Sequence, residues 1–192
     1  MMTAASSGIG RLSVAVAMLA GFLVLPGCPP KDPPQTMAYV DIARYMGLWY
    51  EIAKYPVFFE RGLVGVTAEY TLEEDGRVRV KNRGFEGSFD GEPSLIEGYA
   101  TVKDPESNAK LRIRFDPFPV CLFPADYWII ELDEDYEYAV VSSPERNVLW
   151  ILSRTPVMDD AVYQGIVAGL AERGFDAERL EMMPQQESVA AG

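Results

Sequence analysis

The chain has 192 residues and no histidine, and its 29 Asp and Glu outnumber 17 Lys and Arg, which gives a formal net charge of −12. Apolar residues make up 48% of the sequence and aromatic residues 11%, so the composition predicts a folded chain with a core rather than a disordered one. The acidity argues against binding to nucleic acid and against electrostatic attachment to anionic lipid surfaces. Without histidine there is no Ser-His-Asp triad, no Cys-His pair and no histidine metal site. We therefore expect no enzyme activity, no metal and no cofactor.

The N-terminal region has the pattern of an export signal. Arg11 is the one charged residue before an apolar run over residues 12–25. This run is short for a transmembrane helix and is typical of a secretory signal peptide. It leads into Leu25-Pro26-Gly27-Cys28, which resembles a bacterial lipobox. We predict a lipoprotein signal peptide over residues 1–27 and acylation of Cys28 by chains such as palmitate. The alternative is an ordinary signal peptide followed by a chance cysteine.

The rest of the chain is predicted to divide into three parts. Four prolines follow Cys28, so residues 28–40 are expected to form an extended spacer between the membrane and the domain. The folded domain is expected over residues 41–183, beginning with a helical turn over 41–46 that closes one end. Residues 184–192 are predicted to be a polar tail. If Cys28 is acylated, Cys121 has no partner for an intrachain disulfide.

Strand-like segments fill most of the domain. They have alternating polarity or a β-branched and aromatic composition, and they cover residues 48–57, 64–73, 77–81, 95–103, 111–115, 127–132, 138–142 and 148–153. Because nearly all connections are short, the strands should be antiparallel neighbours. Eight such strands suit an all-β, up-and-down barrel, which removes sheet edges by closure and has room for one small ligand.

One helix is predicted after the strands. Thr155 and Pro156 are expected to begin it and Gly174 to end it. Its apolar face consists of Val162, Ile166, Val167 and Leu170. This face should pack outside the barrel on the last three strands, next to Trp128. A short ninth strand is predicted within residues 175–183.

Two distant residues are predicted to close the barrel. Trp49 begins the first strand after Gly47, and Arg154 follows the last strand. An arginine that stacks on a tryptophan as a cation–π pair would join the first strand to the last.

Three motifs in this chain resemble the signatures of the lipocalins. Gly47-Leu48-Trp49-Tyr50-Glu51-Ile52-Ala53 resembles the first, Asp135-Tyr136 the second, with Glu134 where threonine is usual, and Arg154 the third. The segments 60–63 and 149–156 are most similar to the bacterial outer-membrane lipocalins, a group related to apolipoprotein D. This resemblance implies a lipoprotein that stores or transports fatty acids or lysophospholipids in the cell envelope. Pro29 stands where an aspartate would signal inner-membrane retention, so the expected location is the periplasmic face of the outer membrane.

Six side chains are predicted to contact the ligand: Ile113, Phe115, Tyr127, Val141, Trp150 and Leu152. On strand 111–115 the apolar residues alternate with arginines, and on strand 148–153 Trp150 and Leu152 share the parity of Arg154. The resemblance to lipocalins adds Tyr127 and Val141. We expect the Tyr127 hydroxyl to bind a head group near the mouth of the barrel.

The function classes that stay open are a lipid-binding lipoprotein, an enzyme on the same scaffold and a structural lipoprotein without a ligand. A polar group of side chains inside the barrel would favour the enzyme, and a lumen without a cavity would favour the structural protein. The sequence also leaves open whether two copies pair as a homodimer.

Overall fold

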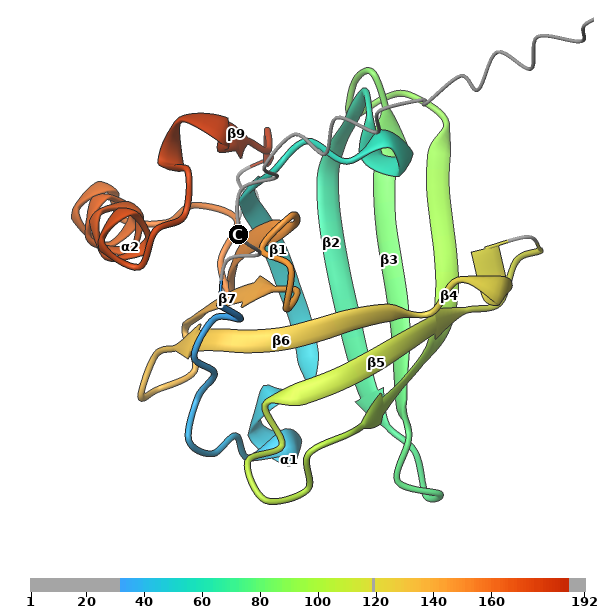
Figure 1. Ribbon diagram of the computed structural model, residues 1–192. Helices are drawn as coiled ribbons and strands as arrows, with labels where there is room; N and C mark the ends of the chain where they lie inside the picture. The colour runs from blue at the N-terminus through green and yellow to red at the C-terminus, as the bar shows by residue number, and fades with distance from the viewer. Residues whose placement is uncertain (1–31, 119, 187–192) are drawn as a thin grey trace, which may run out of the picture.

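The computed structural model describes residues 32–118 and 120–186, which form a closed antiparallel barrel (Figure 1). Each strand from β2 to β7 pairs with the next in sequence, and β1 pairs with both β8 and β2. The barrel strands are β1 (Gly47–Lys54), β2 (Leu63–Leu72), β3 (Val78–Glu86), β4 (Pro93–Val102), β5 (Lys110–Phe115), β6 (Ala125–Leu132), β7 (Tyr138–Ser142) and β8 (Leu149–Ser153). This arrangement confirms the predicted eight-stranded up-and-down barrel. The predicted signal peptide and Cys28 lie outside the described residues.

The strand alternation produces two apolar clusters, one inside the barrel and one outside. Inward residues such as Val78, Val80 and Ile113 form the inner cluster. Outward residues of β1, β6, β7 and β8 form the outer cluster with the helix α2 (Asp160–Glu172). The alternation of arginines and valines in β3 was therefore assigned correctly, but β3 continues to Glu86, beyond the predicted end at residue 81.

Helix α2 differs from its prediction at its start and on its face. Asp159, not Thr155, is its N-cap, and the Asp159 Oδ1 accepts hydrogen bonds from the backbone N–H groups of Ala161 and Val162. Asp side chains compete well for this position because they satisfy the free N–H groups of the first turn. Val162 is exposed, whereas Ile166 and Leu170 are buried against the barrel. The helix thus packs through a narrower stripe than predicted.

The first described residues do not form a free spacer. The backbone N–H of Met37 donates to Ile129 O at 3.0 Å, and that of Val40 donates to Ser107 O at 2.7 Å. Val40 is fully buried in the inner cluster. The last residues of the predicted spacer over 28–40 therefore pack against the barrel, held by the burial of Val40.

The C-terminal segment is likewise tied to the barrel. After the 3-10 turn η3 (Ala177–Arg179), the short strand β9 (Glu181–Met182) pairs with the end of β1. Pro184 O accepts a hydrogen bond from Gly65 N, and Gln185 Nε2 donates to Glu51 O and Val66 O, both at 2.8 Å. The predicted ninth strand is present, and the beginning of the predicted polar tail instead bridges β1 and β2.

The sequence motifs meet at the closed end, beside α1 (Ile42–Tyr45). Arg154 Cζ lies 3.7 Å from the centroid of the Trp49 ring, and the guanidinium donates to Leu48 O, Arg44 O and Tyr136 O. Trp49 Nε1 donates to Tyr45 O at 2.9 Å. Gly47 has a φ of +100°, and a Cβ there would lie 3.3 Å from Arg154 Nη1. Arginine donors thus hold together α1, β1 and the turn before β7, and glycine allows the close approach.

No helix within the described part of the chain is both long and apolar enough to cross a membrane.

Candidate functional site

The candidate site is an internal cavity of about 90 Å³ between the open end of the barrel and its closed end. The 3-10 turn η1 (Phe58–Glu60), which follows β1, contributes Phe59 and Glu60 at the open end. Strands β1, β2, β3, β5, β6 and β8 supply the walls. The remaining lining residues are Glu51, Val66, Thr67, Ala68, Tyr70, Asn82, Ile113, Phe115, Ala125, Asp126, Tyr127, Trp150 and Leu152. The cavity is small beside the roughly 300–1,000 Å³ of typical ligand pockets, so its size favours one thin chain over a bulky ring system.

Five of the six predicted ligand residues surround this one cavity: Ile113, Phe115, Tyr127, Trp150 and Leu152. Val141 is fully buried in the inner cluster, but it does not line the cavity. Trp128 belongs to the outer cluster, where Lys110 Nζ lies 5.0 Å from its ring centroid. Strand parity therefore separated the inward Trp150 from the outward Trp128.

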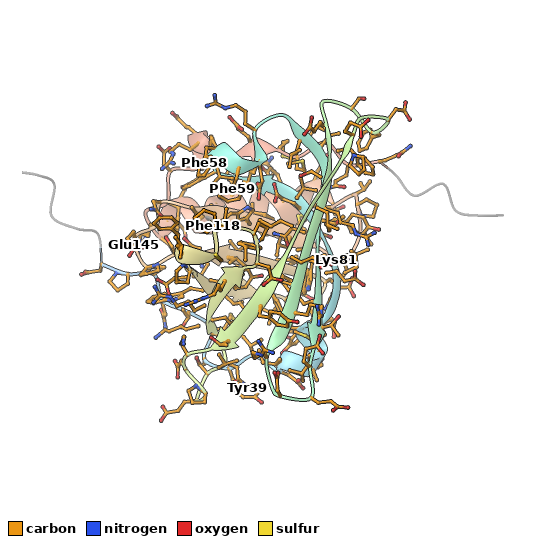
Figure 2. All side chains as sticks on the ribbon, turned by 90° about the vertical axis from the view of Figure 1, so that its right-hand side faces the viewer. Tyr39, Phe58, Phe59, Lys81, Phe118 and Glu145 are labelled. Carbon is orange, nitrogen blue, oxygen red and sulfur yellow. The ribbon has the colours of Figure 1, made fainter. Side chains whose placement is uncertain are left out.

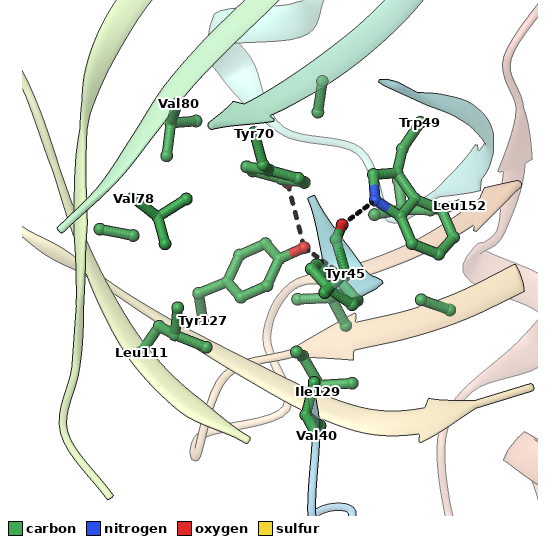
Figure 3. Packing of buried hydrophobic residues seen from close by; sticks show 14 of the residues in the cluster. Val40, Tyr45, Trp49, Tyr70, Val78, Val80, Leu111, Tyr127, Ile129 and Leu152 are labelled. Carbon is green, nitrogen blue, oxygen red and sulfur yellow. Dashed lines mark hydrogen bonds between the residues drawn. The ribbon is translucent and has the colours of Figure 1, made fainter. Parts of the chain in front are cut away.

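Tyr127 forms part of a tyrosine cluster at the inner end of the cavity (Figure 3). Its hydroxyl lies 2.7 Å from the Tyr45 hydroxyl and 3.0 Å from the Tyr70 hydroxyl. Burial raises the pKa of Tyr45 and Tyr127 well above the usual tyrosine value, so the hydroxyls stay neutral. The prediction that Tyr127 faces a head group near the mouth is wrong, because α1 brings Tyr45 into the barrel to pair with this hydroxyl.

A buried charged cluster, which consists of Glu51, Lys54 and Glu60, lies at the other end of the cavity. Lys54 Nζ donates to Glu60 Oε2 at 2.9 Å and lies 3.9 Å from Glu51 Oε1. All three residues are less than 8% exposed. A second cleft of about 460 Å³ lies between η1 and the C-terminal segment, and Glu60 lines both spaces. The Glu51–Lys54–Glu60 cluster therefore separates the cavity from this outer cleft.

Glu51 is the titratable group most affected by this environment. Burial raises its pKa well above the ordinary value of 4.5, and the negative charge of Glu60 raises it further, while Lys54 acts in the opposite direction. Glu51 therefore tends to hold its proton in the folded chain. A carboxyl group that is protonated in an apolar cavity can both donate and accept a hydrogen bond.

The sequence did not predict Glu51 and Glu60 at the site, because glutamate side chains are mostly exposed in folded proteins. The signal for Glu51 was available, because it shares the inward parity of Trp49 on the same strand. A bulge between Glu51 and Ala53 then shifts the register of β1 against β8. This bulge breaks the alternation of inward and outward side chains, so that Lys54 points inward although no pattern in the sequence indicates it.

Exposed aromatic side chains surround the open end. Phe58 is 87% exposed on η1 and Phe118 is 80% exposed on the loop after β5. Figure 2 shows Phe58, Phe59 and Phe118 on the same side of the molecule, away from Tyr39 at its lower end. Leu122, in the 3-10 turn η2 (Val120–Leu122), and Phe123, which follows it, add further exposed apolar surface. An apolar rim of this kind is an unfavourable surface in water and a favourable one for contact with lipid.

The other chemical candidates are weak. Cys121 is a free, half-buried thiol on η2. Over residues 32–118 and 120–186, no three Asp, Glu or Cys side chains gather in a way that could hold a metal ion.

Solved structures share this barrel. Insecticyanin from the tobacco hornworm Manduca sexta has a TM-score of 0.62 at 20% identity, over 85% of this chain and 89% of that one. Lobster apocrustacyanin A1 has a TM-score of 0.61 at 21% identity, over 84% and 95% of the two chains. At these identities the likeness supports the fold alone.

Sequence comparison gives the family. A model of the lipocalin-like domain matches residues 40–185. The chain is 39% identical to temperature-induced lipocalin-1 of Arabidopsis thaliana, over 82% of this chain and 86% of that protein. It is 38% identical to the outer membrane lipoprotein Blc of Escherichia coli K12, over 91% and 97%, and 34% identical to mouse apolipoprotein D, over 82% of each. The predicted resemblance is thus confirmed, and the chain belongs to the lipocalin family.

Proposed function

We propose that this protein binds one single-chain lipid, of the class that includes fatty acids and lysophospholipids, inside its barrel. The observation that carries this proposal is a small cavity whose wall is mostly apolar and aromatic, with Phe115, Trp150 and Leu152 among its side chains. An acyl chain gains roughly 0.8 kcal/mol for each CH₂ that it buries, and it needs no catalytic group. The apolar rim of Phe58, Phe59 and Phe118 gives such a chain a favourable path to the open end.

We prefer binding to catalysis because the cation and the hydroxyl groups near the cavity are already engaged in hydrogen bonds. Lys54 is held by Glu60 and the tyrosines hydrogen-bond in a chain. The structural alternative keeps one argument in its favour, which is the small volume of the cavity. A lipid titration separates these functions.

Trp150 should report lipid binding through its fluorescence. Trp150 lines the cavity, whereas Trp128 lies outside the barrel in the outer cluster, so only Trp150 should lose contact with water when an acyl chain enters. In a titration with a lysophospholipid, the Trp128→Phe variant should keep the spectral shift and the Trp150→Phe variant should lose most of it. Trp49 stays in both variants as a constant background.

Two outcomes would contradict this expectation. Absence of any shift, together with no binding in calorimetry, would favour the structural protein. A shift that persists in Trp150→Phe and disappears in Trp128→Phe would mean that strand β8 is assigned to the wrong register.

We further propose that acylated Cys28 anchors the protein in the outer membrane, facing the periplasm. The lipobox-like run before Cys28 and the relative named an outer membrane lipoprotein support this proposal. Cys28→Ser should move the protein from the membrane fraction to the soluble fraction, or leave it unprocessed, because the thiol that accepts the lipid is gone. Fractionation with mass spectrometry of the N-terminus measures this. Normal cleavage with full membrane retention would overturn the anchor.

A further inference from the structure

The wall of the cavity carries acidic groups without basic ones. Three carboxyl side chains line it, those of Glu51, Glu60 and Asp126, and no lysine or arginine does so among the described residues. Lys54, which is the buried cation nearby, donates to Glu60 Oε2 at 2.9 Å and to Glu60 O at 3.4 Å. These bonds leave no surplus positive charge inside the barrel. A carboxylate or phosphate that entered the cavity would therefore find no cation to pair with, in a medium that screens its charge poorly.

Two buried oxygen atoms on this wall accept no hydrogen bond from any described residue: Glu51 Oε1 and Asn82 Oδ1. Glu51 is 4% exposed, and its Oε1 is 3.9 Å from Lys54 Nζ, which is beyond hydrogen-bond length. Buried polar atoms are nearly always paired, and leaving one unpaired is expensive. Asn82 Oδ1 can only accept, and Glu51 Oε1 accepts whenever the carboxyl proton is absent or on Oε2. A partner that satisfies both atoms is therefore a hydrogen-bond donor.

From this arrangement we propose that the preferred ligand is a single-chain amphiphile whose polar end donates hydrogen bonds and carries no negative charge, either an alcohol or a protonated amine. The donor end would satisfy Glu51 Oε1, and the chain would lie along Phe115, Trp150 and Leu152. This inference rests on the proposed lipid-binding function, and it narrows the class of lipids that the barrel takes: fatty-acid carboxylates are disfavoured, and the phosphate of a lysophospholipid stays outside the cavity.

The test compares three probes with the same ten-carbon chain: decylamine, decan-1-ol and decanoate. Calorimetric titration at pH 7 should give dissociation constants for decylamine and decan-1-ol at least about tenfold lower than for decanoate. Glu51→Leu removes the acceptor and should raise the dissociation constant of decylamine by about tenfold or more, which brings it close to that of decanoate. Glu69→Gln, at an exposed position on β2, is the control for net charge and should leave all three constants unchanged.

Glu51→Gln covers the case in which Glu51→Leu fails to fold. Glutamine keeps a carbonyl acceptor and loses the ionisable group. The dissociation constant of decylamine should therefore rise by about tenfold, while that of decan-1-ol should change by less than about twofold. The inference is overturned if decanoate binds as tightly as decylamine, or if decylamine keeps its affinity in the folded Glu51 variant. If none of the three probes binds the wild-type protein, the proposed lipid-binding function fails as well, and the two failures are thereby distinguished.

Discussion

Trp49→Ala is expected to lower the free energy of unfolding by about 3–5 kcal/mol, because it opens a cavity in a fully buried part of the closed end. The indole contacts the Tyr45 ring, with centroids 4.9 Å apart, and lies under the Arg154 guanidinium at 3.7 Å. Its loss also leaves Tyr45 O without the donor Nε1. Urea unfolding followed by circular dichroism measures the change.

Two companion variants show which part of this contact matters. Trp49→Phe keeps an aromatic ring and should recover most of the loss, whereas Trp128→Ala, at a half-buried outer position, should destabilise less. Neither Trp49 nor Arg154 lines the cavity, so a folded Trp49→Phe protein should bind lipid with nearly unchanged affinity. A large loss of affinity with wild-type stability would show that this pair acts in binding rather than in closure.

The barrel could be predicted because its strands alternate cleanly and its turns are short. In β3 the valines of the run 77–81 face inward and the charged residues outward, and this settles the register of the strand. The pairing of Trp49 with Arg154 could also be predicted, since cation–π stacking needs only the two side chains at matching strand ends. The start of helix α2 could be predicted less well from the local sequence. Both Thr155 and Asp159 are good N-caps, but the Thr155 hydroxyl donates to Val157 O, and Asp159 caps the helix.

The acidic part of the site could not be read with the same rules. A glutamate in a strand is exposed in most proteins, and only its partner makes burial tolerable. For Glu51 that partner is Lys54, which turns inward through a bulge that the sequence does not announce. Tyr127 was assigned to the right face but to the wrong depth, because its partner Tyr45 comes from a separate element, α1. A local bulge in β1 and one contact from a separate element therefore account for what was missed.

Lys54→Met is expected to destabilise the protein by about 3–5 kcal/mol at pH 8, because it leaves buried carboxyl groups without their cation. The Lys54 side chain is 6% exposed, and its Nζ lies 2.9 Å from Glu60 Oε2, so water screens this ion pair very little. The matched control is Lys81→Met at the surface. Lys81 Nζ lies 3.3 Å from Glu97 Oε1, but this pair is partly exposed and its loss should change stability by only about 0–1 kcal/mol.

The loss of stability in Lys54→Met should also depend on pH, and the direction of this dependence follows from the pKa of Glu51. The pKa of Glu51 is raised in the folded chain, so between 4.5 and that raised pKa the native state holds more protons than the unfolded state. Its contribution to stability is therefore complete below pH 4.5 and is lost as the pH rises through the folded pKa. Without Lys54 the folded pKa rises further, so urea unfolding should show a smaller loss at pH 5 than at pH 8. An equal loss at both pH values, or a loss no larger than that of Lys81→Met, would mean that Lys54 does not compensate the buried carboxyl groups.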